Sequence, residues 1–449
     1  MSMSFIIACE SGKRKIAEIL LANKEVDVNY TDEKGRTAIH YAAHQGYLEL
    51  VKNLITEGAN QDYEDHNGET PLYFALLQKQ KHTAIFLLEN GANTNLKTFQ
   101  DNSILHIAAQ TGQTEIIEKL LKDGFEVDLE NKEALTPLHI AVSYKHREAV
   151  KVLLENNATI EKTTKNGNTP LLIACATESK PIIDILLENN ANINVRNHEE
   201  ETPLLIVCCH NNKLLAKLLV EKGADIFAEN KNGVSAIWIA CANNQKELVA
   251  LFLDNGLDVN YAKPLANDDN LVNSYLDWVE AAENIGLDSS FSLNNTATQG
   301  GETLLHLAVK NNSTNMVKFL LEKGINVNTE DEGGNTALHF ASLNGKKDIV
   351  KILLENKANP NATNNKSQKP IEYSNSKGFN EITELLLSFG STDKAQSSVV
   401  NTTAATASQT ATTVADKKTA LLDLKELLDA GILSVEEFDV EKKKILNQL

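Results

Sequence analysis

The chain has 449 residues, of which 42% are hydrophobic, and a formal net charge of -18 at pH 7. A chain of this length normally divides into two or three domains, although a repeat array can grow without a central core. The strong acidic balance disfavours contact with a phosphate backbone, so no nucleic-acid partner is expected.

A secretory signal, a membrane-spanning helix and a disulfide framework are also not expected. The apolar run in Met1–Gly12 has no charged leader and no cleavage signature, which argues against a secretory signal. No stretch has the apolar length of a membrane helix. Five cysteines in a chain of this size do not suggest a disulfide framework, so a reducing compartment, the cytosol, is expected.

A hydroxyl residue recurs at one constant interval along most of the chain. The series is Thr37, Thr70, Ser103, Thr136, Thr169, Thr202 and Ser235, and it resumes at Thr303 and Thr336. A degraded unit follows around Lys369, and a capping unit precedes the series, with Met3 in place of the hydroxyl residue. The sequence therefore predicts ten repeat units after an N-terminal cap.

Each unit carries the signals of a helix pair. In Thr136–Pro137 the hydroxyl caps free backbone donors, and proline suits the first helical position. Apolar residues in Ile116–Leu121 fall at helical spacing and indicate a second helix, which Gly124 ends in a left-handed conformation. Turn residues such as those in Asp32–Gly35 join successive pairs through hairpin-like loops.

These residues carry a family resemblance. The run Thr136–Ala141, T-P-L-H-I-A, matches the T-P-L-H-x-A signature of ankyrin repeats. The period of that family, about 33 residues, is also the interval between the hydroxyl residues here. The resemblance covers roughly residues 1–390 and implies an all-α ankyrin-repeat solenoid of helix-turn-helix units. Residues 1–260 hold the cap and seven units, and residues 299–390 hold three units, the last being the C-terminal cap.

Between these two arrays lies an insert, residues 261–298. The interval from Ser235 to Thr303 is close to two repeat periods, so it holds one repeat and an insert of nearly the same length. A helical stripe that includes Leu271 and Tyr275 fits either a degenerate repeat or a helix looped out from the stack. Its acidic residues are spaced for helix capping and solvation, so no catalytic carboxylate pair is expected there.

The C-terminal part has two segments of different composition. Residues 391–419 are rich in Ser, Thr and Ala and are predicted to form a disordered linker. Residues 420–449 resemble the SHOCT module, a short helical hairpin found mainly in bacterial proteins, through the run KELLDAGILSVEEF. The resemblance implies a bacterial origin and homo-oligomerisation or docking. The expected contact residues are Leu424, Leu427, Leu428, Phe438, Ile445 and Leu446.

A metal site formed by repeated cysteines is not expected. Cys175, Cys208 and Cys241 recur at the repeat interval, and stacked helices lie about 8–10 Å apart. That separation is too large for a disulfide and poor for a shared zinc ion. Ala43 and Ala109 occupy the same unit position elsewhere, which indicates a small packing residue.

Five histidines also share one unit position: His40, His106, His139, His306 and His339. In ankyrin repeats this histidine ties neighbouring loops together, which implies a structural role here. Tyr73 and Trp238 fill the same position in other units, which a catalytic or metal-binding histidine would not permit. Since phosphate-binding glycine loops and nucleophile elbows are missing too, the sequence predicts no enzyme, no cofactor and no bound metal.

A protein partner is expected on the concave side of the array. In the ankyrin family the hairpin tips and the outer face of the first helices vary and bind. Transfer by unit position gives eight candidates, among which the aromatic residues are the favoured anchors. The candidates are Arg36, His44, Phe99, Gln100, Gln110, Leu135, Tyr144 and His210.

The sequence thus predicts a cytoplasmic scaffold that binds a partner protein on its concave ankyrin face and uses the C-terminal hairpin to oligomerise or dock. The alternative is a bacterial effector that is delivered into a eukaryotic host cell and binds host proteins in the host cytosol. Glutamates 436, 437 and 441 resemble a translocation signal as well as the polar face of a helix. A third hypothesis, an enzyme with its site in the insert, lacks candidate residues.

Overall fold

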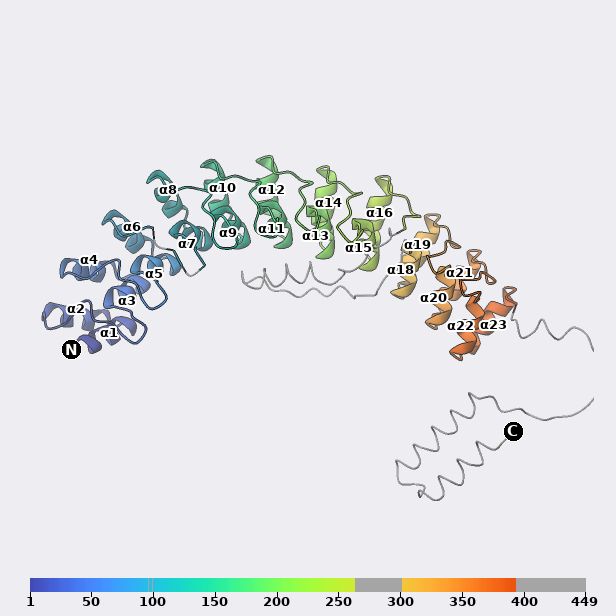
Figure 1. Ribbon diagram of the computed structural model, residues 1–449, viewed down its shortest axis with the longest axis horizontal. Helices are drawn as coiled ribbons and strands as arrows, with labels where there is room; N and C mark the ends of the chain where they lie inside the picture. Colours follow the sequence, from blue (N-terminus) through green and yellow to red (C-terminus); the bar gives the residue numbers. More distant parts are fainter. Residues whose placement is uncertain (96, 99, 263–300, 393–449) are drawn as a thin grey trace, which may run out of the picture. The chain divides into compact units, whose positions relative to one another are not determined.

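The computed structural model describes residues 1–95, 97–98, 100–262 and 301–392. Residues Met1–Ser391 form one compact unit. Helices come in antiparallel pairs, and each pair packs on the pairs before and after it. The first helices form one row and the second helices form another, and the first row lies on the inner side of the curve of residues 1–391 (Figure 1). The predicted all-α ankyrin-type solenoid is confirmed.

The bounds of the helices follow the predicted register. The first helices are α1 (Ser2–Glu10), α3 (Ala38–Gln45), α5 (Pro71–Leu77), α7 (Ile104–Thr111), α9 (Pro137–Ser143), α11 (Pro170–Ala176), α13 (Pro203–Cys209), α15 (Ala236–Ala242), α18 (Leu304–Lys310), α20 (Ala337–Leu343) and α22 (Pro370–Ser376). The second helices are α2 (Arg14–Ala22), α4 (Leu48–Thr56), α6 (Lys81–Glu89), α8 (Thr114–Lys122), α10 (Arg147–Glu155), α12 (Lys180–Glu188), α14 (Lys213–Glu221), α16 (Lys246–Asp254), α19 (Thr314–Glu322), α21 (Lys347–Glu355) and α23 (Asn380–Ser388).

The helices begin and end through the capping residues that the sequence predicts. Thr136 has an extended backbone, its side chain accepts a hydrogen bond from the backbone of His139, and Pro137 starts the helix. After α8, Gly124 adopts a φ of +92°, which ends the helix in the left-handed region. Where the unit has no glycine, asparagine or lysine takes the same conformation, as Asn157 does at +63° and Lys357 at +68°.

The core lies between the two helix rows and runs continuously along them. Leu138, the leucine of the T-P-L-H motif, is fully buried. Cys175, Cys208 and Cys241 are also fully buried, which confirms their interpretation as packing residues. All five cysteines of the chain are free and buried. Burial raises the pKa of the Cys241 thiol to about 12.

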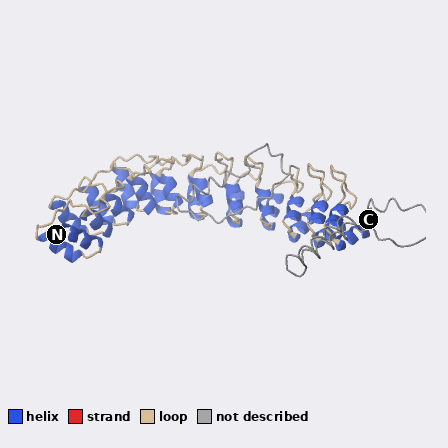
Figure 2. Ribbon diagram, turned by 60° about the horizontal axis from the view of Figure 1, so that its bottom comes forward, coloured by secondary structure: helices blue, strands red, loops and turns tan. Residues whose placement is uncertain are grey.

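The hairpin loops are joined to one another from repeat to repeat. The Oδ1 atom of Asn131 accepts hydrogen bonds from the backbone nitrogens of Glu133 and Leu135, both at 2.9 Å, and closes its own hairpin. Its Nδ2 atom donates to the side chain of Asn102 in the preceding repeat at 2.7 Å. Asn197 and Asn364 make the same link one repeat back. In the described parts of the chain, the loops lie beside the helix rows (Figure 2).

The two repeats that flank residues 263–300 stack directly on each other. Ala262 and Thr303 form an isolated bridge of the kind that joins Glu229 to Ser235 and Glu330 to Thr336, although far more chain lies between its two ends. The backbone of Asn326 donates to Asn260 at a sequence separation of 66, where the equivalent bond from Asn359 to Asn328 has a separation of 31. Helix α15 packs against α18 as any neighbouring first helix does. The bonds between successive repeats are therefore kept across the inserted segment.

The insert, from residue 263 onward, lies outside the described residues, and so do residues 393–419 of the linker and the hairpin 420–449 with its leucines. Within the described ranges, no helix has both the length and the apolar character needed to cross a membrane.

Candidate protein-binding surface

The motif histidines join each repeat to the next one. The Nδ1 atom of His40 lies 2.9 Å from the hydroxyl of Thr37 and 3.0 Å from its backbone nitrogen. Its Nε2 atom lies 3.1 Å from the carbonyl oxygen of Glu69, so this nitrogen must carry the proton. The predicted structural role is confirmed, since equivalent contacts recur in four further repeats. Three histidines meet the carbonyl 29 residues ahead, as His40 does: His106 to Leu135, His306 to Asn335 and His339 to Gln368. His139 instead meets the carbonyl of Lys162, 23 residues ahead in the next loop.

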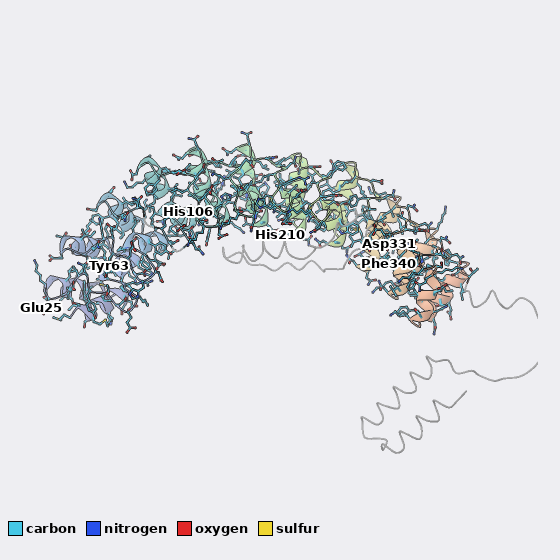
Figure 3. All side chains as sticks on the ribbon, in the orientation of Figure 1. Glu25, Tyr63, His106, His210, Asp331 and Phe340 are labelled. Atoms are coloured by element: carbon cyan, nitrogen blue, oxygen red, sulfur yellow. The ribbon has the colours of Figure 1, made fainter. Side chains whose placement is uncertain are left out.

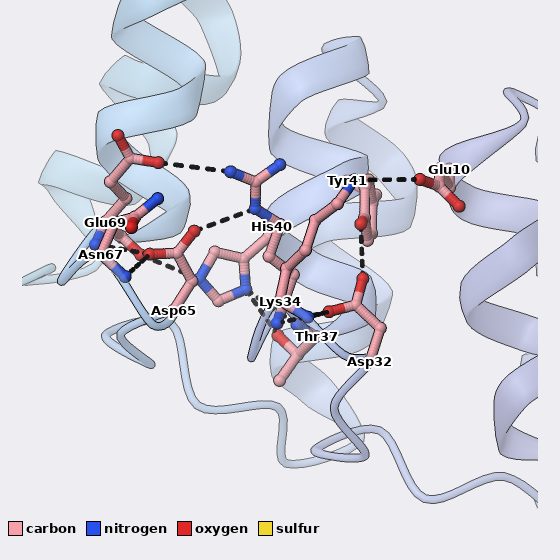
Figure 4. A network of polar contacts seen from close by, with 10 residues as sticks. Glu10, Asp32, Lys34, Thr37, His40, Tyr41, Asp65, Asn67 and Glu69 are labelled. Atoms are coloured by element: carbon pink, nitrogen blue, oxygen red, sulfur yellow. Dashed lines mark hydrogen bonds and ion pairs between the residues drawn. The ribbon is translucent and has the colours of Figure 1, made fainter.

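In one pair of repeats, a cluster of charged side chains lies beside the neutral histidine contacts. Arg36 Nε donates to Asp65 Oδ2 at 2.9 Å, and Nη2 donates to Glu69 Oε2 at 3.3 Å (Figure 4). The guanidinium carbon also lies 4.5 Å from the ring centroid of Phe74. Burial, with the nearby Asp65 charge, raises the pKa of the Glu69 carboxyl. The cluster therefore fixes Arg36 and leaves an excess of negative charge around it.

A second carboxylate positions the backbone that carries Arg36. Tyr41 donates its hydroxyl hydrogen to Asp32 Oδ2 at 2.5 Å. Oδ1 of Asp32 accepts from the backbone nitrogens of Lys34 at 2.8 Å and Arg36 at 2.9 Å. Burial alone would raise the pKa of Asp32, but these three hydrogen bonds hold it below its ordinary value.

Arg36 and Tyr41 line a hollow of about 190 Å³ on the first-helix row, over α3 and α5. The rings of His40, Tyr41 and Phe74 are buried and form its floor. The charged ends of Glu10 and Lys34 stand 3.8 Å apart at its rim and are well exposed. A space of this size with an aromatic floor suits one inserted side chain of a partner protein. Its lining is Glu10, Lys34, Arg36, His40, Tyr41, His44, Gln45 and Phe74.

Two of the eight sequence-derived candidates, Arg36 and His44, meet in this hollow. The ring of His44 lies 6.1 Å from that of Phe74, measured between centroids. Burial, and then the charge of Arg36, lower the pKa of His44, so the imidazole is neutral at pH 7.

Two further candidates lie together in the middle of the array. Gln110 Nε2 donates to the hydroxyl of Tyr144 at 3.0 Å. The Tyr144 ring stacks on His146 with 6.5 Å between centroids, and its side chain remains exposed. The prediction that Tyr144 is an exposed aromatic anchor on this row is consistent with that geometry.

The remaining candidates do not join either group. Gln100 is exposed at a hairpin tip, and Phe99 lies outside the described residues. His210 is half-buried at the end of α13, in a separate repeat (Figure 3). Burial lowers its pKa. The expectation of an accessible Leu135 is wrong. Its side chain is only 6% exposed, and its backbone carbonyl accepts the hydrogen bond from His106.

Sequence reasoning missed the acidic partners of Arg36. Asp32 and Asp65 occupy one unit position, and Arg36 and Glu69 occupy another. The register could therefore have revealed the cluster, because it aligns Arg36 in one hairpin with the carboxylates of Asp65 and Glu69 in the next. Among the described residues, no group of three or more His, Cys, Asp or Glu side chains is arranged to hold a metal ion.

Helix pairs that are hydrogen-bonded from repeat to repeat, with an exposed inner row of first helices, form the architecture of a helical-repeat binding protein. The family model of ankyrin repeats (three copies) matches residues 5–98, 105–197, 191–263 and 266–364. The chain belongs to the ankyrin-repeat family, whose members act as protein-binding scaffolds.

Among solved structures, the ankyrin repeat domain of human ASB11 is 26% identical and has a TM-score of 0.45. The match covers 49% of this chain and 98% of that one. The search of curated proteins found no match.

Proposed function

We propose that this protein is a cytosolic scaffold that binds a partner protein along its row of first helices. The hollow lined by Arg36, His44 and Phe74 carries the proposal, because it is a preorganised cavity on that row. Arg36 is held by two ionic hydrogen bonds and Tyr41 by one, so little side-chain entropy remains to be lost on binding. Five free, buried thiols favour a reducing compartment.

Tyr144 supplies a second contact on the same row. Its hydroxyl is already oriented by Gln110, and its exposed ring is backed by His146. A rigid, half-exposed aromatic side chain is a typical interface anchor. In this proposal the C-terminal segment, residues 420–449, links or docks such scaffolds and raises their effective concentration on a multivalent partner.

Site-specific photo-crosslinking in the full chain tests the proposal. A photoreactive phenylalanine analogue replaces His44 or Tyr144, and a control places it at Leu214, which is 82% exposed on a second helix. We expect the same partner to be captured from positions 44 and 144 and not from 214. Equal capture from position 214, or capture from neither inner position, would contradict binding on the first-helix row.

Delivery into a eukaryotic host is the second candidate, and it is supported by the SHOCT-like run and the glutamates near the C-terminus. A translocation assay that compares the full chain with one lacking its last thirty residues tests it. Transfer of the full chain but not of the shortened one supports the effector role, and failure of both to transfer contradicts it.

A further inference from the structure

Glu10 occupies a unit position that carries a small packing residue in other repeats. The equivalent residues at one, three and five repeat periods further along are Ala43, Ala109 and Cys175, and all three are fully buried. Glu10 is instead exposed, and it lines the hollow over α3 and α5. A carboxylate at a position that elsewhere fills the space between repeats indicates a role other than packing.

The carboxylate of Glu10 lies where a cation is favoured. Glu10 is the last residue of α1, whose final turn contains no basic residue. The carbonyl groups at the end of a helix carry partial negative charge, so a carboxylate there is disfavoured unless a cation lies near it. Within the described ranges its ion-pair partner is Lys34, whose Nζ atom lies 3.8 Å from Glu10 Oε1. That distance exceeds an ordinary hydrogen bond, and the Lys34 side chain is 62% exposed.

The polar contacts of the hollow bring four carboxylates together with two cations. The carboxylates belong to Glu10, Asp32, Asp65 and Glu69, and the cations belong to Lys34 and Arg36. An acidic guest would add a fifth carboxylate, whereas a basic guest reduces the imbalance of charge. The net charge of -18 attracts basic partners toward the chain in the same way.

The floor of the hollow suits the long stem of a basic side chain. The rings of Tyr41 and Phe74 are at most 7% exposed and lie at its base. The guanidinium carbon of Arg36 already lies 4.5 Å from the centroid of the Phe74 ring, so this floor accommodates a cation. The methylene groups of lysine and arginine pack on apolar surfaces while their charged heads reach a polar rim.

We propose that the hollow receives a lysine or arginine side chain of the partner protein, whose charged head binds the carboxylate of Glu10 in place of Lys34. The stem of this side chain lies on the rings of Tyr41 and Phe74. The inference rests on the proposed binding of a partner along the first-helix row, and it specifies the chemistry of one contact there. Lys34 holds the place of the guest in the free protein and is displaced when the partner binds.

Three small probes with the same number of carbon atoms test this charge preference without the partner. They are n-butylammonium, which reproduces the side chain of lysine, n-butanol and butyrate. The full chain with labelled histidines reports binding through the ring resonance of His44, which is identified by its loss in His44→Gln. We expect n-butylammonium to bind about fivefold more tightly than either other probe. Tighter binding of butyrate, equal binding of the three probes, or no shift with any of them would overturn the proposal.

Matched variants locate the preference at one carboxylate. Glu10→Gln removes the charge in the hollow, and Glu33→Gln removes the same charge from an exposed hairpin residue that does not line it. We expect the preference for n-butylammonium to disappear in Glu10→Gln and to remain in Glu33→Gln. Preference retained in both variants, or lost equally in both, would contradict the role of Glu10.

Lys34→Met tests the displacement of Lys34. Removal of the competing ammonium should tighten the binding of n-butylammonium about two- to fivefold, and weaker binding would contradict displacement. The photo-crosslinking at positions 44 and 144 judges the scaffold separately. Capture of a partner there without a preference for n-butylammonium would refute only the basic guest, and the preference without capture would refute only the binding of a partner on this row.

Discussion

The Nε2 atom of His106 lies 2.9 Å from the carbonyl oxygen of Leu135, which is 29 residues further along and belongs to the next hairpin. Its Nδ1 atom lies 2.8 Å from the hydroxyl of Ser103 at the start of the same helix. We expect His106→Ala to lower the free energy of unfolding by about 2–3 kcal/mol, because a buried carbonyl and a helix cap lose their partner. Urea denaturation measures the change.

The matched control for this substitution is His82→Ala, since His82 is exposed on α6. Its effect should stay within about 0.5 kcal/mol. An equal effect of both substitutions would mean that the link between repeats contributes nothing beyond the helix itself.

The buried histidines should make stability depend on pH. Burial lowers the pKa of His106, His139 and His306 to about 4 in the folded chain, while an unfolded histidine titrates near 6.5. The unfolded state therefore binds more protons between these values. The contribution of each histidine is fully present above pH 6.5 and is lost as the pH falls toward 4, roughly 3 kcal/mol at full shift.

Urea midpoints at pH 7.5 and 4.5 measure this dependence, and His306→Tyr isolates one histidine. Tyrosine already occupies this unit position at Tyr73, and it does not titrate in this range. The variant should lose less stability than the native chain between the two pH values. Identical losses would show that His306 is protonated alike in both states.

The motif leucines should be the most sensitive core positions. Leu138 is fully buried between α9 and its neighbours, so Leu138→Ala should cost about 2–5 kcal/mol through lost contacts and a residual cavity. Leu214→Ala removes the same atoms from an exposed site and should cost less than about 0.5 kcal/mol. Thermal unfolding of the two variants decides whether the assigned register holds.

Removal of residues 263–297 should leave the stack intact. The deletion leaves as many residues between Ala262 and Thr303 as lie between Glu229 and Ser235, which form the equivalent bridge. Since the bond between Asn260 and Asn326 needs no residue of this segment, the urea midpoint should change little. A large loss of cooperativity would mean that the segment is part of the stack.

The register of the helices could be predicted from the sequence because one capping residue, such as Thr136, and one buried leucine, such as Leu138, recur at a constant interval. Each requirement is local to one unit, so periodicity alone reveals it. The structural role of the histidines followed from the family resemblance, and the geometry of His40 confirms it.

The candidate site was harder to predict because it depends on contacts between units. Leu135 was treated as a hairpin-tip residue, although its apolar side chain is buried. The hollow requires Arg36 and Phe74 from two successive repeats to come together, with Arg36 held by Asp65 of the second repeat. Position within a unit does not show which side chain of the next unit a residue meets.

The bonds that cross between repeats determine when each repeat becomes stable during synthesis. No described side-chain hydrogen bond between repeats spans more than 37 residues, apart from those that cross residues 263–300. A growing chain can therefore complete most repeats as soon as about one further repeat has left the ribosome. The repeat that ends at Ala262 must wait for the chain beyond Thr303. At a synthesis rate of about 5–20 residues per second, the last face of the stack that ends at Ala262 therefore stays uncovered for roughly 2–8 s.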